Sequence, residues 1–395
     1  MKLSSVAFIA GALFLGPTLC YPQQAQPAQA PPRDTSPQIL DVQGGKIRVV
    51  TMATGLFHPW GIAFADANTI LVTERNGALR IIRNGVLAPN PVWTSPTPSA
   101  PPPASAQNQG GQQGGDRLHF VAVHPDFAQN HLVYVSYPKT GEKGTTLAVA
   151  RGFLKGDVLG DVQEIFVADA WERGGNLAGR VFFGKDKNLY VTIGDRDRIC
   201  CNAEQKRPDG SDDNSLRMKS QTLDNHVGKT LRLRDDGTVP PDNPFVGKPG
   251  AKPEIYTYGH RNGYGLAVNP ETGELWQAEI GPMGGDEVNI LQPGHNYGWP
   301  LVSMGRNYTG TLASDQPFAR PGMDNARMFW VPSISPSSIM FYTGDKFPRW
   351  KNNLFDGAMT TQQLIRVASG QPSQAERREV HLIPMRVRVR VVQQS

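Results

Sequence analysis

One pattern recurs along this chain and restricts the folds open to it: an apolar run, a turn rich in Asp, Asn, Pro or Gly, and a second apolar run. Four copies read WGIAFADANTILVTE (60–74), FVAVHPDFAQNHLVYVSY (120–137), RVFFGKDKNLYVTIGD (180–195) and YGLAVNPETGELWQAE (264–279). Each copy is typical of a β-hairpin that cannot bury both of its faces alone. Radial stacking of such hairpins buries both faces and leaves short edges, which predicts a β-propeller. A two-sheet β-sandwich is the alternative, but this many similar hairpins argues against it.

Composition supports the all-β class. Charged residues are 19 % of the chain, and it contains 42 Gly and 33 Pro, which fits a turn-rich β protein better than a helical one. No long window shows the 3.6-residue apolar period of a helix. The net charge is +5, but Lys and Arg are scattered rather than clustered, so no nucleic-acid partner is expected.

The N-terminus predicts export. Lys2 precedes an apolar run from Val6 to Leu15 that is too short to span a bilayer, which predicts a signal peptide over residues 1–20. A disordered leader is predicted over residues 21–44, and the folded domain over residues 45–395. We therefore expect a periplasmic or secreted protein without stable membrane insertion.

Two adjacent cysteines, Cys200 and Cys201, would remain in the mature chain. Two thiols do not make a disulfide framework. A metal role would need further ligands nearby. We interpret them as an incidental or locally bridging pair in a surface loop.

The stretch from Tyr258 to Pro300 carries the strongest chemical signal. Its second strand is followed by Gly-Pro-Met-Gly-Gly-Asp-Glu (281–287), a loop that places backbone carbonyls beside two carboxylates. Converging oxygen atoms suit a hard cation such as calcium. Arg261 supplies a planar fork for an anionic ligand. Together these residues predict a site for an acidic organic cofactor held partly through a metal.

This stretch resembles the soluble aldose (glucose/sorbosone) dehydrogenases, which use pyrroloquinoline quinone. The resemblance recurs, in the family's order, at residues 58–83, 120–137, 179–196, 221–245 and 333–359. It implies a six-bladed β-propeller that oxidises the C1 hydroxyl of an aldose sugar to a lactone and passes electrons to an external acceptor. It also implies pyrroloquinoline quinone and calcium as cofactors, and a monomer or homodimer.

His124 is the predicted general base. From its position before Pro125 alone, a histidine is more often a turn-capping residue. The resemblance favours catalysis, because a base is needed to form the alkoxide from which hydride departs.

The resemblance assigns the remaining site residues. Those expected to contact the quinone are Gln113, Arg261, Asn262, Tyr308, Arg386 and Arg388. Carbonyls of Gly281 and Pro282 are expected to bind a calcium ion that polarises the quinone. Glu287 and the Tyr297 carbonyl match a second calcium position.

The resemblance fails at the C-terminal end. Val389 stands where the family has Asp, and the expected terminal strand pair is absent. We expect an incomplete last blade, with residues 46–52 as the strand that closes the ring, and weakened activity. Two alternatives follow: a non-catalytic propeller that binds a sugar or a protein, and a calcium-dependent propeller hydrolase.

Overall fold

The computed structural model describes residues 34–42, 45–96, 118–197, 214–368, 377–382 and 386–395. The predicted signal peptide, Gln113, Cys200 and Cys201 lie outside these residues. The predicted leader is described in part, and its described portion contains a strand, β1 (Gln38–Val42).

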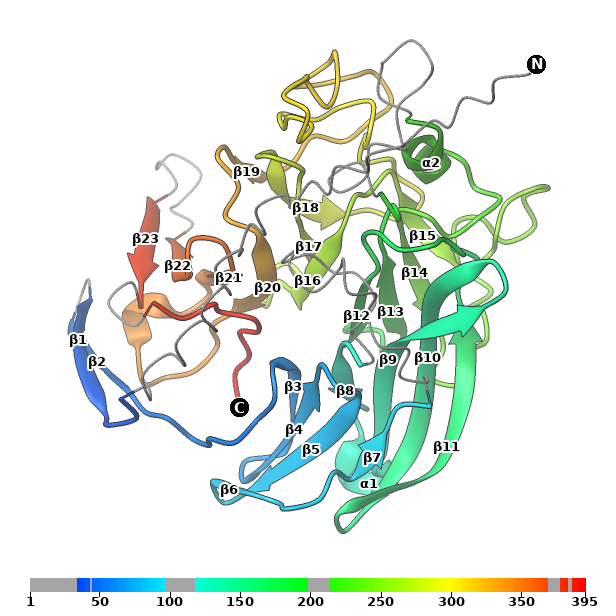
Figure 1. Ribbon diagram of the computed structural model, residues 1–395. Helices are drawn as coiled ribbons and strands as arrows, with labels where there is room; N and C mark the ends of the chain where they lie inside the picture. Colours follow the sequence, from blue (N-terminus) through cyan, green and yellow to red (C-terminus); the bar gives the residue numbers. More distant parts are fainter. Residues whose placement is uncertain (1–33, 43–44, 97–117, 198–213, 369–376, 383–385) are drawn as a thin grey trace, which may run out of the picture.

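Strands dominate the described chain and form five antiparallel sheets of consecutive strands (Figure 1). The first sheet contains β3 (Pro59–Asp66), β4 (Thr69–Glu74), β5 (Ala78–Arg83), β6 (Val86–Leu87) and β7 (Trp93–Thr94). The second contains β8 (Val121–Val123), β9 (Leu132–Gly141), β10 (Gly144–Lys155) and β11 (Val158–Val167). The third contains β12 (Ala178–Phe183), β13 (Leu189–Ile193), β14 (Lys229–Leu233) and β15 (Ile255–Tyr258). The fourth contains β16 (Gly263–Val268), β17 (Leu275–Glu279), β18 (Asp286–Leu291) and β19 (Met328–Trp330). The fifth contains β20 (Pro336–Phe341), β21 (Leu354–Ala358), β22 (Gln363–Ala368) and β23 (Arg377–His381).

Helical structure is confined to single turns in the described residues. These turns are α1 (Phe127–Asn130), α2 (Ser215–Met218), η3 (Lys219–Gln221) and η4 (Pro348–Trp350). The predicted all-β class is therefore confirmed.

The first strand of each sheet lies innermost, and these strands neighbour one another in the order β3, β8, β12, β16, β20. The sheets are thus blades around a common axis, and the predicted β-propeller is confirmed (Figure 1). The described residues form five blades, where six were predicted. The fifth blade, β20 to β23, has four strands.

A C-terminal segment without regular secondary structure, residues 386–395, lies between β20 and β3. Ser337 Oγ donates to the Val389 carbonyl at 2.6 Å, and Ser338 Oγ donates to the Val392 carbonyl at 3.1 Å. On the other side, the Arg390 guanidinium lies 4.3 Å from the Trp60 ring centroid. This segment therefore bridges the gap between the last blade and the first.

The strand expected to close the ring does not do so. Residues of β2 (Gly45–Val49) pair with β1 in a separate two-stranded sheet, and with no blade in the described structure. This hairpin lies against residues 346–350, beside the fifth blade. The alternation of residues 46–52 predicted a strand correctly for residues 46–49, but it carried no information about the partner.

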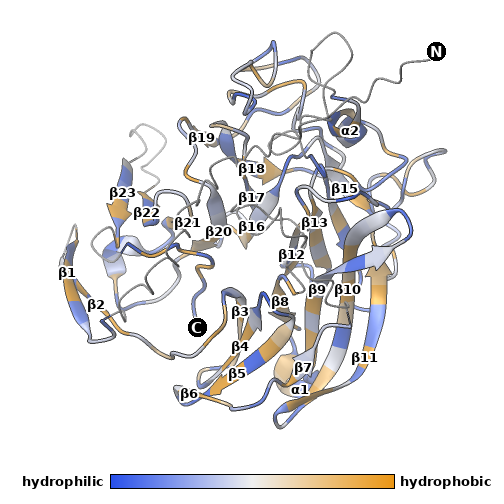
Figure 2. Ribbon diagram, in the orientation of Figure 1, coloured by the Kyte–Doolittle hydropathy of each residue, from blue (hydrophilic) through white to orange (hydrophobic). Residues whose placement is uncertain are grey.

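Burial explains the local strand patterns. Every residue of β13 and β14 is buried, because each of these strands has a neighbouring blade on both faces. Figure 2 shows hydrophobic residues distributed along the strands of the blades rather than gathered in one layer. The largest apolar cluster accordingly joins blades two, three and four, through residues such as Tyr134, Leu189 and Tyr264.

One buried carboxylate in the fifth blade has no hydrogen-bond partner among the described residues. Asp356 in β21 is fully buried, and neither of its carboxylate oxygens has a hydrogen-bond partner in the described structure. Burial, followed by repulsion from Asp286, raises the pKa of Asp356 well above its ordinary value of 3.8. This residue should therefore destabilise the fold as pH rises above that ordinary value.

Asp356→Asn should increase the free energy of unfolding near pH 8 by about 1–3 kcal/mol, the cost of an uncompensated buried group. The gain should shrink as pH falls through that ordinary value of 3.8, because well below it the carboxyl is protonated in both the folded and unfolded states. Urea unfolding at several pH values measures it, with exposed Asp345→Asn as the control. A pH-independent gain, or none, would contradict this account.

Candidate functional site

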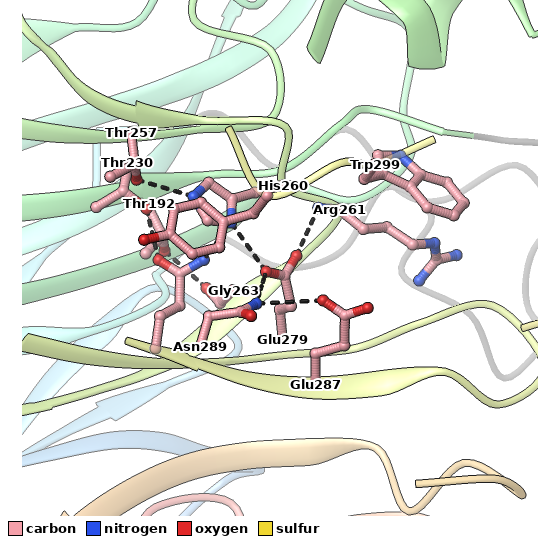
Figure 3. A network of polar contacts seen from close by, with 12 residues as sticks. Thr192, Thr230, Thr257, His260, Arg261, Gly263, Glu279, Glu287, Asn289 and Trp299 are labelled. Carbon is pink, nitrogen blue, oxygen red and sulfur yellow. Dashed lines mark hydrogen bonds and ion pairs between the residues drawn. The ribbon is translucent and has the colours of Figure 1, made fainter. Parts of the chain in front are cut away.

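The candidate site lies at the end of the axis where the innermost strands begin. Arg261 immediately precedes β16 and is buried. Its Nη1 donates to the carbonyls of Ile280 and Gly281, both at 2.8 Å, and its backbone N–H donates to Glu279 Oε2 at 2.7 Å. Figure 3 shows its side chain extending toward Trp299. The predicted binding residue is thus held rigidly by the loop that follows β17.

Two guanidinium groups lie close to the ring of Trp299. Those of Arg217 and Arg261 lie 5.0 and 5.5 Å from its ring centroid. Arg217 Nη2 pairs with Asp197 Oδ2 at 2.8 Å, while Arg261 Nη2 lies 3.8 Å from the same oxygen. Arg217 Nη1 also donates to Asn307 Oδ1 at 2.7 Å. The result is a flat aromatic face bordered by positive charge.

Asp195 connects this aromatic face to the strand ends. It follows β13, is fully buried, and accepts hydrogen bonds from Asn176 Nδ2 at 2.9 Å and Trp299 Nε1 at 2.7 Å. The backbone N–H of Asp197 donates to it as well, at 2.9 Å. Burial, followed by repulsion from Asp197, raises the pKa of Asp195 above its ordinary 3.8. Its protonation state is therefore tuned by the fold.

Asn262 lies beside these groups with an unused acceptor. Its Nδ2 approaches Asn176 Oδ1 at 3.5 Å. Its own Oδ1 is buried and has no hydrogen-bond partner in the part of the chain the structure describes. A buried amide oxygen without a donor is costly, so a bound molecule that donates to it would stabilise the site.

A second cluster, rich in oxygen atoms, lies under Arg261 (Figure 3). His260 Nδ1 donates to Glu279 Oε1 at 2.8 Å. Asn289 Nδ2 donates to Glu279 Oε1 at 2.9 Å and to Glu287 Oε2 at 3.2 Å, whereas Asn289 Oδ1 is buried without a partner among the described residues. Burial, followed by repulsion from Glu279, raises the pKa of Glu287. Two carboxylates and an unused amide oxygen are ligands that a hard cation prefers.

The predicted calcium ligands lie in two different surroundings. The Gly281 carbonyl accepts a hydrogen bond from Arg261 Nη1 at 2.8 Å, and the predicted calcium site at Gly281 and Pro282 stays a prediction. Glu287 lies in the oxygen-rich cluster, and the Tyr297 ring stacks on His260 at 4.8 Å. No group of three or more His, Cys, Asp or Glu residues is arranged to hold a metal in the described chain.

The glycines of the 281–285 loop allow a close turn. A Cβ on Gly281 would collide with the carbonyls of Gly284 and Gly285. The Gly281 N–H donates to Asp286 Oδ1 at 2.9 Å, and the other oxygen of that carboxylate accepts from the N–H groups of Ile334 and Ser335. The loop is thereby fixed to the fifth blade.

His124 is not part of this site. It follows β8 and lines a cavity together with the last residues of the innermost strands, at the opposite end of the axis from Arg261. Its Nδ1 accepts from the Asp126 N–H at 3.0 Å and faces Asn130 Nδ2 at 2.7 Å. The prediction that His124 acts as the base beside the quinone is corrected by this placement. The turn-capping alternative describes its contacts.

Among the described residues, two further predicted quinone contacts, Tyr308 and Arg388, lie toward the Arg261 end. Tyr308 is half exposed and follows Asn307, the partner of Arg217. Arg388 Nε donates to the Met359 carbonyl at 3.3 Å, close to the start of β20, and Arg386 precedes it on the exposed side of the same segment.

Sequence reasoning missed four members of the site. Asp195 is the last residue of the third copy of the hairpin pattern and Asp197 follows it, so the polar strand end was a usable signal. Trp299 lies in NYGWP (296–300), within the stretch already singled out. Arg217 had no local signal, because it reaches the site from a segment that reads only as a polar insertion.

The model of the glucose/sorbosone dehydrogenase family matches residues 56–395. The chain belongs to this family. It is 35 % identical over 325 residues to aldose sugar dehydrogenase YliI of Escherichia coli, covering 81 % of this chain and 80 % of that protein. It is 31 % identical over 270 residues to quinoprotein glucose dehydrogenase B of Acinetobacter calcoaceticus, covering 65 % of this chain and 53 % of that protein.

A solved structure agrees with this membership. The PQQ-bound form of an aldose sugar dehydrogenase from Streptomyces coelicolor matches with a TM-score of 0.62 and 25 % identity, over 92 % of this chain and 90 % of that one. The predicted resemblance is confirmed, and the protein is an oxidoreductase of the sugar dehydrogenase class. Within the described residues, no helix has the length and apolar character needed to cross a membrane.

Proposed function

We propose that this glucose/sorbosone dehydrogenase family member oxidises aldoses at C1 to lactones, with pyrroloquinoline quinone bound at the Arg261 end of the axis. The observation that carries the proposal is the Trp299 ring bordered by the guanidinium groups of Arg217 and Arg261. Two relatives support the proposal. The Acinetobacter calcoaceticus relative is named a quinoprotein, and the Streptomyces coelicolor relative was solved with the quinone bound. Export to the periplasm or medium, and a monomer or homodimer, remain part of the proposal.

The residues present fit the quinone. Its carboxylates suit the guanidinium groups, and its planar ring suits the face of Trp299. The buried Asn262 Oδ1 offers an acceptor that the described chain leaves unused. When bound, the quinone supplies the two-electron acceptor for the sugar, and an external acceptor then removes the electrons.

We assign the role of general base to Asp195 rather than to His124. Its carboxylate orients Trp299 through Oδ2, and Asn176, which is half-buried, through Oδ1. Because its pKa is raised, the ionised form is a stronger proton acceptor than an ordinary aspartate. We assign proton uptake from the C1 hydroxyl to the Asp195 carboxylate.

The test is reconstitution of the purified protein with pyrroloquinoline quinone, followed by dye reduction on a panel of aldoses. We expect quinone-dependent, sugar-dependent dye reduction. Sugar binding without dye reduction would favour the non-catalytic propeller instead, and lactone or ester cleavage would favour the hydrolase.

We assign a calcium ion to the cluster of Glu279, Glu287 and Asn289 rather than to Gly281. Calcium should raise the melting temperature of the protein, because a ligand present at 100 times its dissociation constant stabilises the native state by about 2.7 kcal/mol. Glu287→Gln should abolish most of this shift, whereas Glu142→Gln, at an exposed turn, should not. An equal calcium shift in both variants would place the ion elsewhere.

A further inference from the structure

A cavity of about 580 Å³ opens at the end of the axis opposite the Arg261 site. The last residues of all five innermost strands line it, together with Val392 and Gln393 of the C-terminal segment. Its walls are largely aromatic and apolar, and include Phe64, Phe182, Phe183, Met340 and Phe341. The proposed dehydrogenase makes no use of this cavity.

Arg180 in β12 lines the same cavity and is only 6 % exposed. In the described structure its guanidinium makes no hydrogen bond and no ion pair, and its Nε is buried without a partner. The guanidinium does make a cation–π contact with Phe120, whose ring centroid lies 5.2 Å from it. Burial lowers the pKa of Arg180 to about 10, which leaves the group charged at neutral pH.

This isolation is unusual within the molecule. The other deeply buried arginines all donate to carbonyls or carboxylates; they are Arg196, Arg217, Arg232, Arg261 and Arg366. A buried charge without a partner costs several kcal/mol, so proteins pair such charges with an acid or with a ligand. No acidic side chain lines the cavity, so the missing partner is a bound anion.

The chemistry of the cavity defines that anion. A lone guanidinium matches one negative charge, and its planar fork matches a carboxylate. The aromatic walls suit an apolar body rather than a sugar acid. His124 on the same wall keeps its proton on Nε2, because its Nδ1 accepts the Asp126 N–H, and it therefore offers a second donor.

We propose that this axial cavity is a second ligand site, which binds a small organic monocarboxylate with an apolar body through Arg180. The site is independent of the proposed oxidation, because it uses none of the residues around Arg261.

The test compares benzoate with neutral benzamide, which has the same shape, by isothermal titration of the full-length protein. We expect benzoate to bind at least about tenfold more tightly than benzamide, because charge-assisted hydrogen bonds are the stronger ones. Arg180→Gln should abolish that preference. Arg83→Gln, at an exposed arginine, should retain it.

Two further measurements test benzoate binding in the cavity if Arg180→Gln fails to fold. Ala65→Phe, at a partly exposed position on the cavity wall, should reduce benzoate binding while leaving Arg180 in place. Chloride at equal concentration should not displace benzoate. Equal binding of benzoate and benzamide, unchanged benzoate binding in Arg180→Gln, or full displacement by chloride would each overturn the proposal.

Discussion

Arg261→Gln should weaken quinone binding by about 30- to 1,000-fold, equivalent to roughly 2–4 kcal/mol for the loss of one buried charge-assisted contact. The side chain is buried, is fixed by two carbonyls and borders the Trp299 face, so a neutral amide cannot replace its charge. Titration of the apoprotein with quinone, followed by the quenching of tryptophan fluorescence, measures the affinity. Arg83→Gln serves as the matched surface control.

A folding defect must be separated from a binding defect, because the substitution leaves the carbonyls of Ile280 and Gly281 without their donor. Arg261→Lys keeps the charge and loses the planar fork, so we expect an intermediate affinity. If both Arg261 variants fold and bind quinone as tightly as the parent protein, the cofactor does not contact this residue.

Asp195→Asn should reduce sugar turnover by about 10²–10⁴-fold, the usual contribution of a general base, while changing quinone affinity little. The substitution preserves shape and removes the charge. The parent enzyme should lose turnover as pH falls through the raised pKa of Asp195, since the protonated carboxyl cannot accept the substrate proton. Steady-state kinetics from acid to neutral pH would reveal this acidic limb.

His124→Ala is the informative comparison for Asp195→Asn. Its imidazole caps a turn at the other end of the axis, so we expect turnover close to that of the parent protein. Loss of turnover in His124→Ala together with normal turnover in Asp195→Asn would show that His124, and not Asp195, is the general base.

The sequence predicted the blades well because a hairpin is a local unit. All four copies of the repeat form the two inner strands of a blade, as β3 and β4 do in the first. The number of blades is not local, because it depends on how adjacent sheets pack and on what fills the space between β20 and β3. Residues 46–52 illustrate the same limit, since their alternation fits pairing with β1 as well as pairing with a blade.

The site was predictable only in part, for the same reason. Arg261 and Asn262 belong to one contiguous stretch, so the sequence places them together, and the structure has them side by side. Trp299, Asp195 and Arg217 are far apart in the chain and meet only because their loops share one end of the axis. His124 was misplaced because its local sequence, His-Pro-Asp-Phe, is more often that of a turn, and the direction of the innermost strand then separates it from Arg261.

The most direct test of the account is an experimental structure of the protein soaked with pyrroloquinoline quinone. We predict density for the quinone beside Trp299, with its carboxylates within hydrogen-bonding distance of Arg261 or Arg217. Quinone density in the cavity lined by His124, or none at the Arg261 end at saturating quinone, would contradict the assignment.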